Sequence, residues 1–199
     1  MKVIGFVGIC SMMLVGCIIE VLPAHQLDDG FGRLTETCKE QLRPFSSHRK
    51  VIDDKLVQEI SCAQLSEYLS EHGCTWLMLV ASWCPYAMKD AMELASHRGF
   101  VDSMRITPIV VFIDYDLPSI RKVQRQWGEK VPVVVLGGVD HASGGWLKWK
   151  YLLDHYLPEI SMSERVPQHY LLDEQSHVLR QHDGAITKWS AFLDDGDPG

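Results

Sequence analysis

Hydrophobic and polar positions along the chain form alternating blocks with the lengths of strands and helices. Unbroken apolar runs, typical of strands that are covered on both faces, occupy residues 76–81, 109–113 and 132–136. Apolar residues at helical spacing predict helices between Ser61 and Gly73, from Met88 to Ala95, between Asp116 and Gly128, and from Trp146 to Pro158. Shorter strands are expected at 55–60, 168–172 and 177–181, followed by a last helix carrying Trp189 and Phe192. This order of elements predicts an α/β layered domain.

The 199 residues are enough for one globular domain and an appendage, and 46% of them are hydrophobic. This apolar material can form a core, which excludes disorder of the whole chain. With 26 acidic against 19 basic residues the formal net charge is −7, so nucleic acid is not expected as a partner. Six cysteines remain to be explained by their positions: Cys10, Cys17, Cys38, Cys62, Cys74 and Cys84.

The N-terminus has the pattern of an export signal, with Lys2 followed by an apolar run from 3 to 19. Its end, Leu14-Val15-Gly16-Cys17, resembles the lipobox of bacterial lipoproteins, in which cleavage precedes the cysteine and lipid is attached to its sulfur. The resemblance implies a lipid such as palmitate on Cys17 and a membrane-anchored location in the bacterial cell envelope, facing the periplasm. Ile18 in place of an aspartate implies sorting to the outer membrane. An uncleaved signal anchor is the alternative.

The chain divides into four predicted parts. Residues 1–16 are the signal peptide, 17–50 a lipid-anchored tether, 51–194 the compact domain and 195–199 a flexible tail. The tether has no sustained hydrophobic period, and one short helix is expected in it around Thr35 to Leu42. The domain is expected beyond the cytoplasmic membrane, in an oxidising compartment where paired cysteines persist.

The segment Trp83-Cys84-Pro85-Tyr86 lies between a buried strand and a helix, and Val166-Pro167 precedes a later strand. Together they resemble the thioredoxin superfamily over residues 55–194, in particular its TlpA-like branch of envelope thiol-disulfide proteins. The resemblance implies a thioredoxin-like fold, a central mixed sheet flanked by helices, with an inserted strand and helix before a cis-proline at Pro167. It implies no cofactor. It makes Cys84 the catalytic residue and assigns substrate binding to Trp83, Pro85, Tyr86, Val166 and Pro167.

Elementary chemistry favours the same role for Cys84. A sulfur at the start of a helix faces free N–H groups and the positive end of the helix dipole, which stabilise a thiolate over a thiol. Because only the thiolate attacks a disulfide, Cys84 is the candidate nucleophile. Pro85 fits the first turn of the helix, where its missing N–H is not needed. The alternative interpretation of Cys84 is a small buried core residue.

Ala87 departs from the family, which usually has a second cysteine three residues after the first. An alanine cannot resolve a mixed disulfide, so Cys84 works alone, another thiol resolves it, or the site has lost redox chemistry; an engineered trap is a further alternative. The leading hypothesis is thiol-disulfide exchange through Cys84, with mixed disulfides to envelope proteins that carry cysteines or disulfides. The rival hypothesis is a non-catalytic binding or assembly module of the cell envelope.

The other thiols offer several pairings. Cys38 in the tether and Cys62 at the start of the first helix are candidates either to resolve Cys84 or to form a structural disulfide with each other. Cys74 lies about 20 Å from Cys84, at the other end of an extended strand, and is beyond the reach of a disulfide. The Cys-Pro-Tyr triplet also resembles glutaredoxins, in which glutathione resolves the mixed disulfide.

Two further groups of residues have alternative interpretations. Cys84, Met88 and His169 form a soft set of ligands that would suit copper(I), although Met88 is also a core position and no metal is expected. Asp114 and Asp116 follow a buried strand and form either a pair of acids or, more simply, a helix start with Asp116 as its cap.

Overall fold

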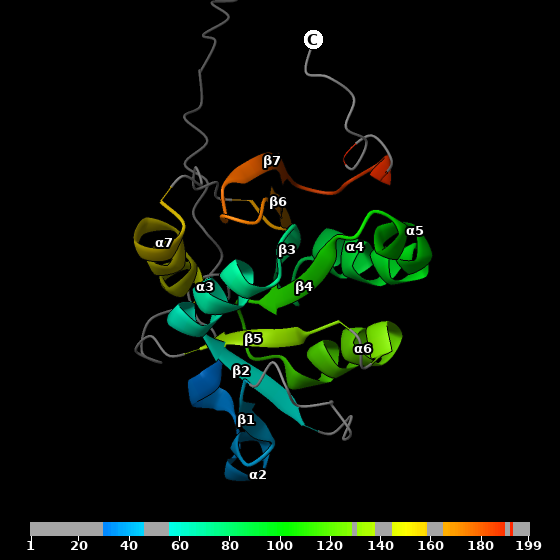
Figure 1. Ribbon diagram of the computed structural model, residues 1–199. Helices are drawn as coiled ribbons and strands as arrows, with labels where there is room; N and C mark the ends of the chain where they lie inside the picture. The colour runs from blue at the N-terminus through cyan, green and yellow to red at the C-terminus, as the bar shows by residue number, and fades with distance from the viewer. Residues whose placement is uncertain are drawn as a thin grey trace, which may run out of the picture.

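The computed structural model describes residues 30–45, 56–128, 131–137, 145–158, 165–189 and 192 (Figure 1). The predicted signal peptide, the lipidation site at Cys17 and the acidic tail lie outside these residues. Within the described part of the chain, no helix is both long enough and apolar enough to span a membrane.

In the described part of the chain the strands form one mixed sheet with the order β1-β2-β5-β4-β3-β6-β7. The bounds of the strands are β1 Leu42–Pro44, β2 Val57–Ser61, β3 Thr75–Val80, β4 Thr107–Phe112, β5 Val133–Gly137, β6 Gln168–Leu172 and β7 Val178–Asp183. The first five strands pair in parallel, whereas β6 runs antiparallel to β3 and β7 antiparallel to β6. The three unbroken apolar runs are β3, β4 and β5 at the centre of the sheet, and they are buried on both faces as predicted.

Helices cover both faces of the sheet (Figure 1). Their bounds are η1 Phe31–Arg33, α2 Glu36–Lys39, α3 Cys62–Glu71, α4 Pro85–Ser96, α5 Arg98–Ser103, α6 Leu117–Trp127 and α7 Gly145–Tyr156. On one face, side chains of the sheet and of α4, α5 and α6 form a hydrophobic core cluster. On the other face, side chains of the sheet and of α3 and α7 form a second one. The predicted fold class is confirmed, including the inserted strand and helix, β5 and α7, that precede Pro167.

Local sequence accounts for where the helices begin and end. Ser61 and Gln64 form a capping box at the start of α3: Ser61 Oγ accepts from the Gln64 N–H (3.2 Å), and Gln64 Oε1 accepts from the Ser61 N–H (3.0 Å). Gly73 ends that region with a φ of 65°, a conformation that suits glycine. Pro85 occupies the first turn of α4, as predicted.

Residues 30–45 differ from the predicted tether. The strand β1 extends the sheet by pairing in parallel with β2, and the ring of Phe31 packs edge-on against Tyr115 at 5.1 Å. The short helix expected near Thr35 is α2, which is capped by the Thr35 side chain. These elements have three or four residues each, too short to produce a hydrophobic period, which is why the sequence pattern does not reveal that they join the domain.

Candidate active site

Cys84 lies at the junction of β3 and α4, where it is the N-cap residue of the helix. Its side chain is only 7% exposed, and Sγ donates to the backbone oxygen of Val166 across 3.3 Å. The Val166-Pro167 peptide is cis, as predicted from the sequence. Two segments far apart in the chain therefore meet at one sulfur atom.

The neighbours of Cys84 differ in exposure. Tyr86 is 63% exposed, Trp83 and Val166 are partly buried, and Pro85 is exposed, so these side chains form a surface beside a nearly buried sulfur. Ala87 is fully buried among the core residues of α4. The structure thus brings Cys84 close to Val166 of the predicted binding residues, and Ala87 places a methyl group where the resemblance implies a second thiol.

The strand order and the cis-proline that contacts the helix-capping cysteine decide the fold. The chain has a thioredoxin-like fold. No protein-family model matches the sequence, and a search of curated proteins returns no match.

Several solved structures resemble this chain at low identity. They include a thiol-disulfide isomerase from Corynebacterium glutamicum, with 12% identity, coverage of 63% of this chain and 79% of that chain, and a TM-score of 0.44. A thioredoxin family thiol:disulfide interchange protein from Chlorobium tepidum has 15% identity, coverage of 61% and 75%, and a TM-score of 0.43. StoA from Bacillus subtilis has 16% identity, coverage of 58% and 76%, and a TM-score of 0.40.

Asp114 holds the loop that leads into Cys84. Its carboxylate accepts a hydrogen bond from the Ser82 N–H across 2.9 Å and another from the Ser82 hydroxyl. Burial raises the pKa of Asp114, and the hydrogen bonds from Ser82 oppose that rise. Sequence reasoning considered Asp114 only as half of an acid pair. Asp116, the predicted cap of α6, is at the N-cap position, but its carboxylate accepts from the Ser119 hydroxyl (2.7 Å) instead of from the helix backbone.

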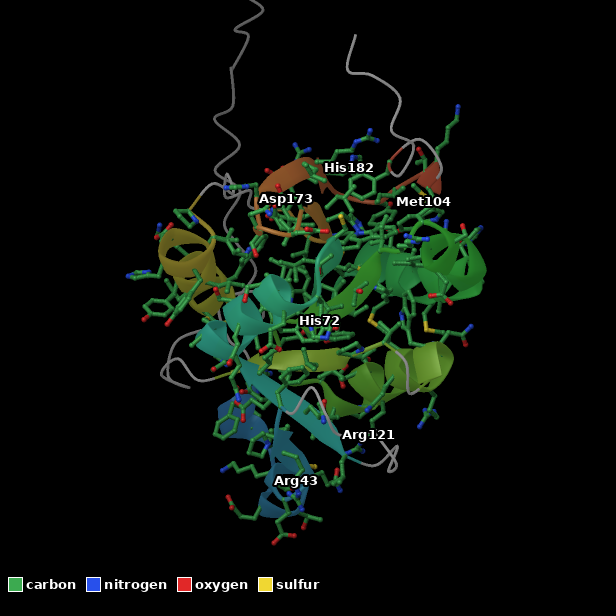
Figure 2. All side chains as sticks on the ribbon, in the orientation of Figure 1. Arg43, His72, Met104, Arg121, Asp173 and His182 are labelled. Carbon is green, nitrogen blue, oxygen red and sulfur yellow. The ribbon has the colours of Figure 1, made fainter. Side chains whose placement is uncertain are left out.

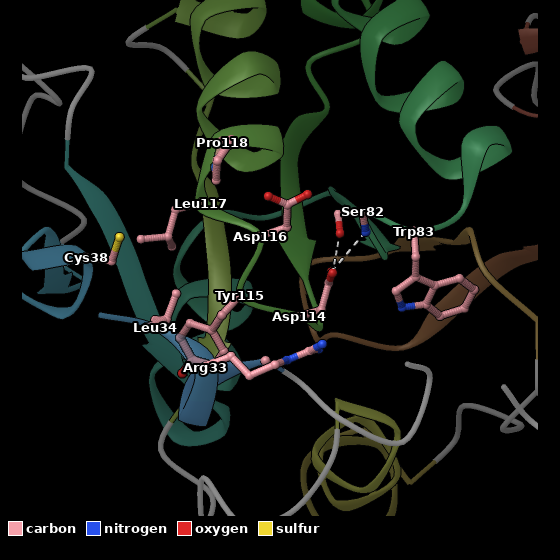
Figure 3. Close-up of a pocket in the computed structure, with 11 residues that line it drawn as sticks. Arg33, Leu34, Cys38, Ser82, Trp83, Asp114, Tyr115, Asp116, Leu117 and Pro118 are labelled. Atoms are coloured by element: carbon pink, nitrogen blue, oxygen red, sulfur yellow. Dashed lines mark hydrogen bonds between the residues drawn. The ribbon is translucent and has the colours of Figure 1, made fainter. Parts of the chain in front are cut away.

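A pocket of about 430 Å³ lies beside this loop (Figure 3). Trp83 and Asp114 form part of its lining, and Arg33 and Cys38 contribute from the N-terminal segment. Trp83, which immediately precedes Cys84 in the chain, is the lining residue next to the cysteine in sequence. The sequence predicts a tether here, with Cys38 alone as a candidate partner of Cys84, and it does not predict that Arg33 and Leu34 also line a pocket beside the loop.

The structure does not bring the candidate partner thiols together. Cys38 packs against the core cluster that contains Cys84, whereas Cys62 lies in the cluster on the other face of the sheet. All four described cysteines are free, and the suggested disulfide between Cys38 and Cys62 is absent from the described residues. Burial raises the pKa of the Cys62 thiol to about 11, which keeps it protonated at neutral pH.

The copper alternative receives no support from the position of His169. Its side chain is fully buried, and Nε2 lies 3.3 Å from Oδ2 of Asp90. In the described part of the chain, no group of three His, Cys, Asp or Glu side chains is arranged to hold a metal ion.

Proposed function

We propose that the protein carries out thiol-disulfide exchange through Cys84 alone. The observation that carries this proposal is the position of Sγ, at the N-terminus of α4 and 3.3 Å from the Val166 oxygen. Cysteines at helix starts often act as nucleophiles in proteins, because the free backbone N–H groups there favour a negatively charged sulfur. The loop before Cys84 is held by the two hydrogen bonds between Ser82 and Asp114. These bonds fix the position from which the sulfur can attack a partner disulfide.

The exchange step balances without a cofactor. The Cys84 thiolate attacks one sulfur of a disulfide in a partner protein, a new S–S bond forms, and the other partner sulfur leaves as a thiolate that takes up a proton. Because Ala87 cannot attack the new bond, the mixed disulfide lasts until a thiol of the partner or of a small molecule such as glutathione resolves it. Long-lived mixed disulfides with partner proteins are therefore the expected products.

The partner is held as an extended segment beside Val166 and Pro167. Tyr86, with 63% of its side chain exposed, and Trp83 provide aromatic surface on the other side of the sulfur. We place this reaction in the bacterial cell envelope, with the protein anchored through lipid on Cys17 and facing the periplasm, because the N-terminal sequence resembles a lipoprotein signal.

Trapping of mixed disulfides in cells tests the proposal. Cells expressing the full chain are quenched with acid and alkylated, and adducts are separated on non-reducing gels and identified by mass spectrometry. The wild type should give adducts that join Cys84 to partner proteins, Cys84→Ser should give none, and the control Cys74→Ser should leave them unchanged. Absence of Cys84 adducts in the wild type would contradict the proposal.

A second candidate function is a binding or assembly module that uses the same surface without redox chemistry. The near-complete burial of the Cys84 side chain, 7% exposed, favours it. Under this alternative, Cys84→Ser retains its partners in a pull-down performed under reducing conditions, and no covalent adduct forms in the wild type.

A further inference from the structure

A buried polar pair connects α4, the helix that begins after Cys84, to β6, the strand that follows Pro167 and is called the cis-proline strand below. Asp90 of α4 and His169 of β6 are 1% and 0% exposed, and Oδ2 of Asp90 lies 3.3 Å from Nε2 of His169. Asp90 lies six residues after Cys84, and His169 two residues after Pro167. A charged side chain on the buried face of a helix destabilises a fold unless it is paired, so this pair requires an explanation beyond apolar packing.

A second connection reaches the cis-proline from the same carboxylate. Oδ2 of Asp90 accepts a hydrogen bond from the Ile186 N–H across 2.9 Å. Two residues earlier, the Gly184 N–H donates to the Pro167 oxygen across 2.8 Å. Asp90 is therefore tied to the cis-proline strand twice, directly through His169 and indirectly through the segment that follows β7.

These contacts define how α4 lies against the strand. At its N-terminus the helix meets the strand through Cys84 Sγ and the Val166 oxygen, and about 9 Å further along its axis it meets the strand again through Asp90 and His169. Together with the packing of Ala87, Ala91 and Leu94 in the core, these two polar contacts constrain the orientation of the helix on this side. The spacing between Cys84 and the Val166 backbone depends on that orientation.

We propose that Asp90 and His169 are positioning residues that set the spacing between Cys84 Sγ and the Val166 backbone, beside which a substrate peptide binds. This inference rests on the proposed function and concerns an extended peptide that must fit alongside Val166. A small disulfide needs only access to the sulfur. The pair should therefore matter for a peptide disulfide much more than for a small one, which a role in stability alone would not produce.

The surroundings of His169 are otherwise largely aromatic. The ring centroids of three aromatic side chains lie 5.8–6.1 Å from that of His169, namely Trp76, Trp189 and Phe192. Among the described residues, the other titratable group that faces it is His182 of β7, labelled in Figure 2, with a ring separation of 6.2 Å. A phenylalanine can replace His169 among these rings, which makes His169→Phe a variant that removes the polar contact and retains an aromatic side chain.

The test compares the rates at which Cys84 forms a mixed disulfide with 2,2′-dithiodipyridine and with an unstructured peptide whose cysteine is capped by glutathione. Mass spectrometry of the Cys84 peptide separates this reaction from those of the other thiols. In His169→Phe the ratio of the peptide rate to the small-probe rate should fall about tenfold, since a misplacement of about 1 Å is costly for a positioned reaction. His169→Gln, which keeps a donor for Asp90, should restore the ratio. The control His155→Phe, at an exposed histidine of α7, should not change it.

Loss of folding is recognised separately. Cys62 is buried and should stay unmodified in any variant that keeps the fold. If His169→Phe exposes Cys62, the double variant Asp90→Asn with His169→Phe is used, because the amide oxygen still accepts from Ile186 and no unpaired charge is buried. An unchanged ratio in a folded variant would overturn the positioning role. A wild type that forms no mixed disulfide at Cys84 would instead overturn the proposed function, and this inference with it.

Discussion

Ala87 determines what Cys84 can do alone. It is fully buried on α4, three residues beyond the sulfur, so its side chain is held against the core near the nucleophile. A thiol there would be close enough to attack a mixed disulfide. Under the proposed thiol-disulfide exchange, an alanine leaves resolution to a thiol from outside the site, so the expected product is a lasting covalent complex.

Replacement of Ala87 by cysteine should therefore confer reductase activity. In Ala87→Cys the two thiols lie one helical turn apart, and their Cα separation falls in the range of about 4–7 Å that a disulfide spans. We expect the variant to reduce insulin disulfides over multiple turnovers with dithiothreitol, whereas the wild type remains at background. Ala91→Cys, at a position that is also fully buried one turn further along, is the matched control and should remain inactive. A folded but inert Ala87→Cys variant would contradict the assignment of the site.

Among the elements, the central strands and the longer helices beside them follow from the sequence. The strands are unbroken apolar runs, and these helices show apolar residues at helical spacing over ten or more residues. The helix start at Ser61 and the proline in the first turn of α4 are local signals and are also predicted correctly. Of the short elements between residues 30 and 45, α2 is predicted, whereas η1 and β1 are not, since pairing of β1 with β2 depends on residues brought together by the fold. The helix α5, Arg98–Ser103, is also missed, because its 6 residues are too few to show a helical period.

The packing of α7 on the sheet depends on a glycine at its start. A Cβ added at Gly145 would lie 2.3 Å from the backbone oxygen of Ile113, which cannot move aside as a flexible side chain would. Gly145→Ala should therefore lower the free energy of unfolding by about 1–3 kcal/mol, measured by urea denaturation. Gly99→Ala in α5 is the matched control, because nothing lies within 4 Å of its added Cβ, and it should be neutral or slightly stabilising. An equal effect of both substitutions would contradict this account of the α7 contact.

At the scale of the whole molecule, the candidate site combines residues that sequence analysis finds with residues that it does not. Cys84 and Val166-Pro167 belong to short motifs and are found. The contacts of Asp114 with Ser82 and of Asp90 with His169 join segments distant in sequence, so no local pattern predicts them. A signal for the second pair does exist: Asp90 shares the buried face of α4 with alanines and a leucine, an unusual place for a charge.

The buried histidine makes the stability of the whole domain depend on pH. Burial lowers the pKa of His169 below its ordinary value of 6.5, although the nearby Asp90 carboxylate opposes this and His182 adds to it. Between that lowered pKa and 6.5 the unfolded chain binds a proton that the folded protein does not, so stability is lost as the pH falls through this interval. One such proton contributes a slope of at most about 1.4 kcal/mol per pH unit.

Urea unfolding of the wild type and of His169→Gln at several pH values between 7.5 and 5 checks this. The wild type should lose stability relative to the variant below pH 6.5, and the two curves should run parallel above it. The raised pKa of Asp114 acts in the opposite sense, from the ordinary value of 3.8 upward, and is common to both proteins. Parallel curves throughout would show that His169 does not titrate differently in the folded state.

The outer edge of the sheet at β1 limits how the molecule associates with copies of itself. Phe45 donates its N–H to Glu59 on β2, so by the alternation of a strand the backbone nitrogen of Pro44 points away from the sheet. A proline has no hydrogen to offer there, and the strand is only three residues long. An incoming strand would find few hydrogen-bond donors at this edge, so pairing between copies of the chain is disfavoured at the β1 side of the sheet.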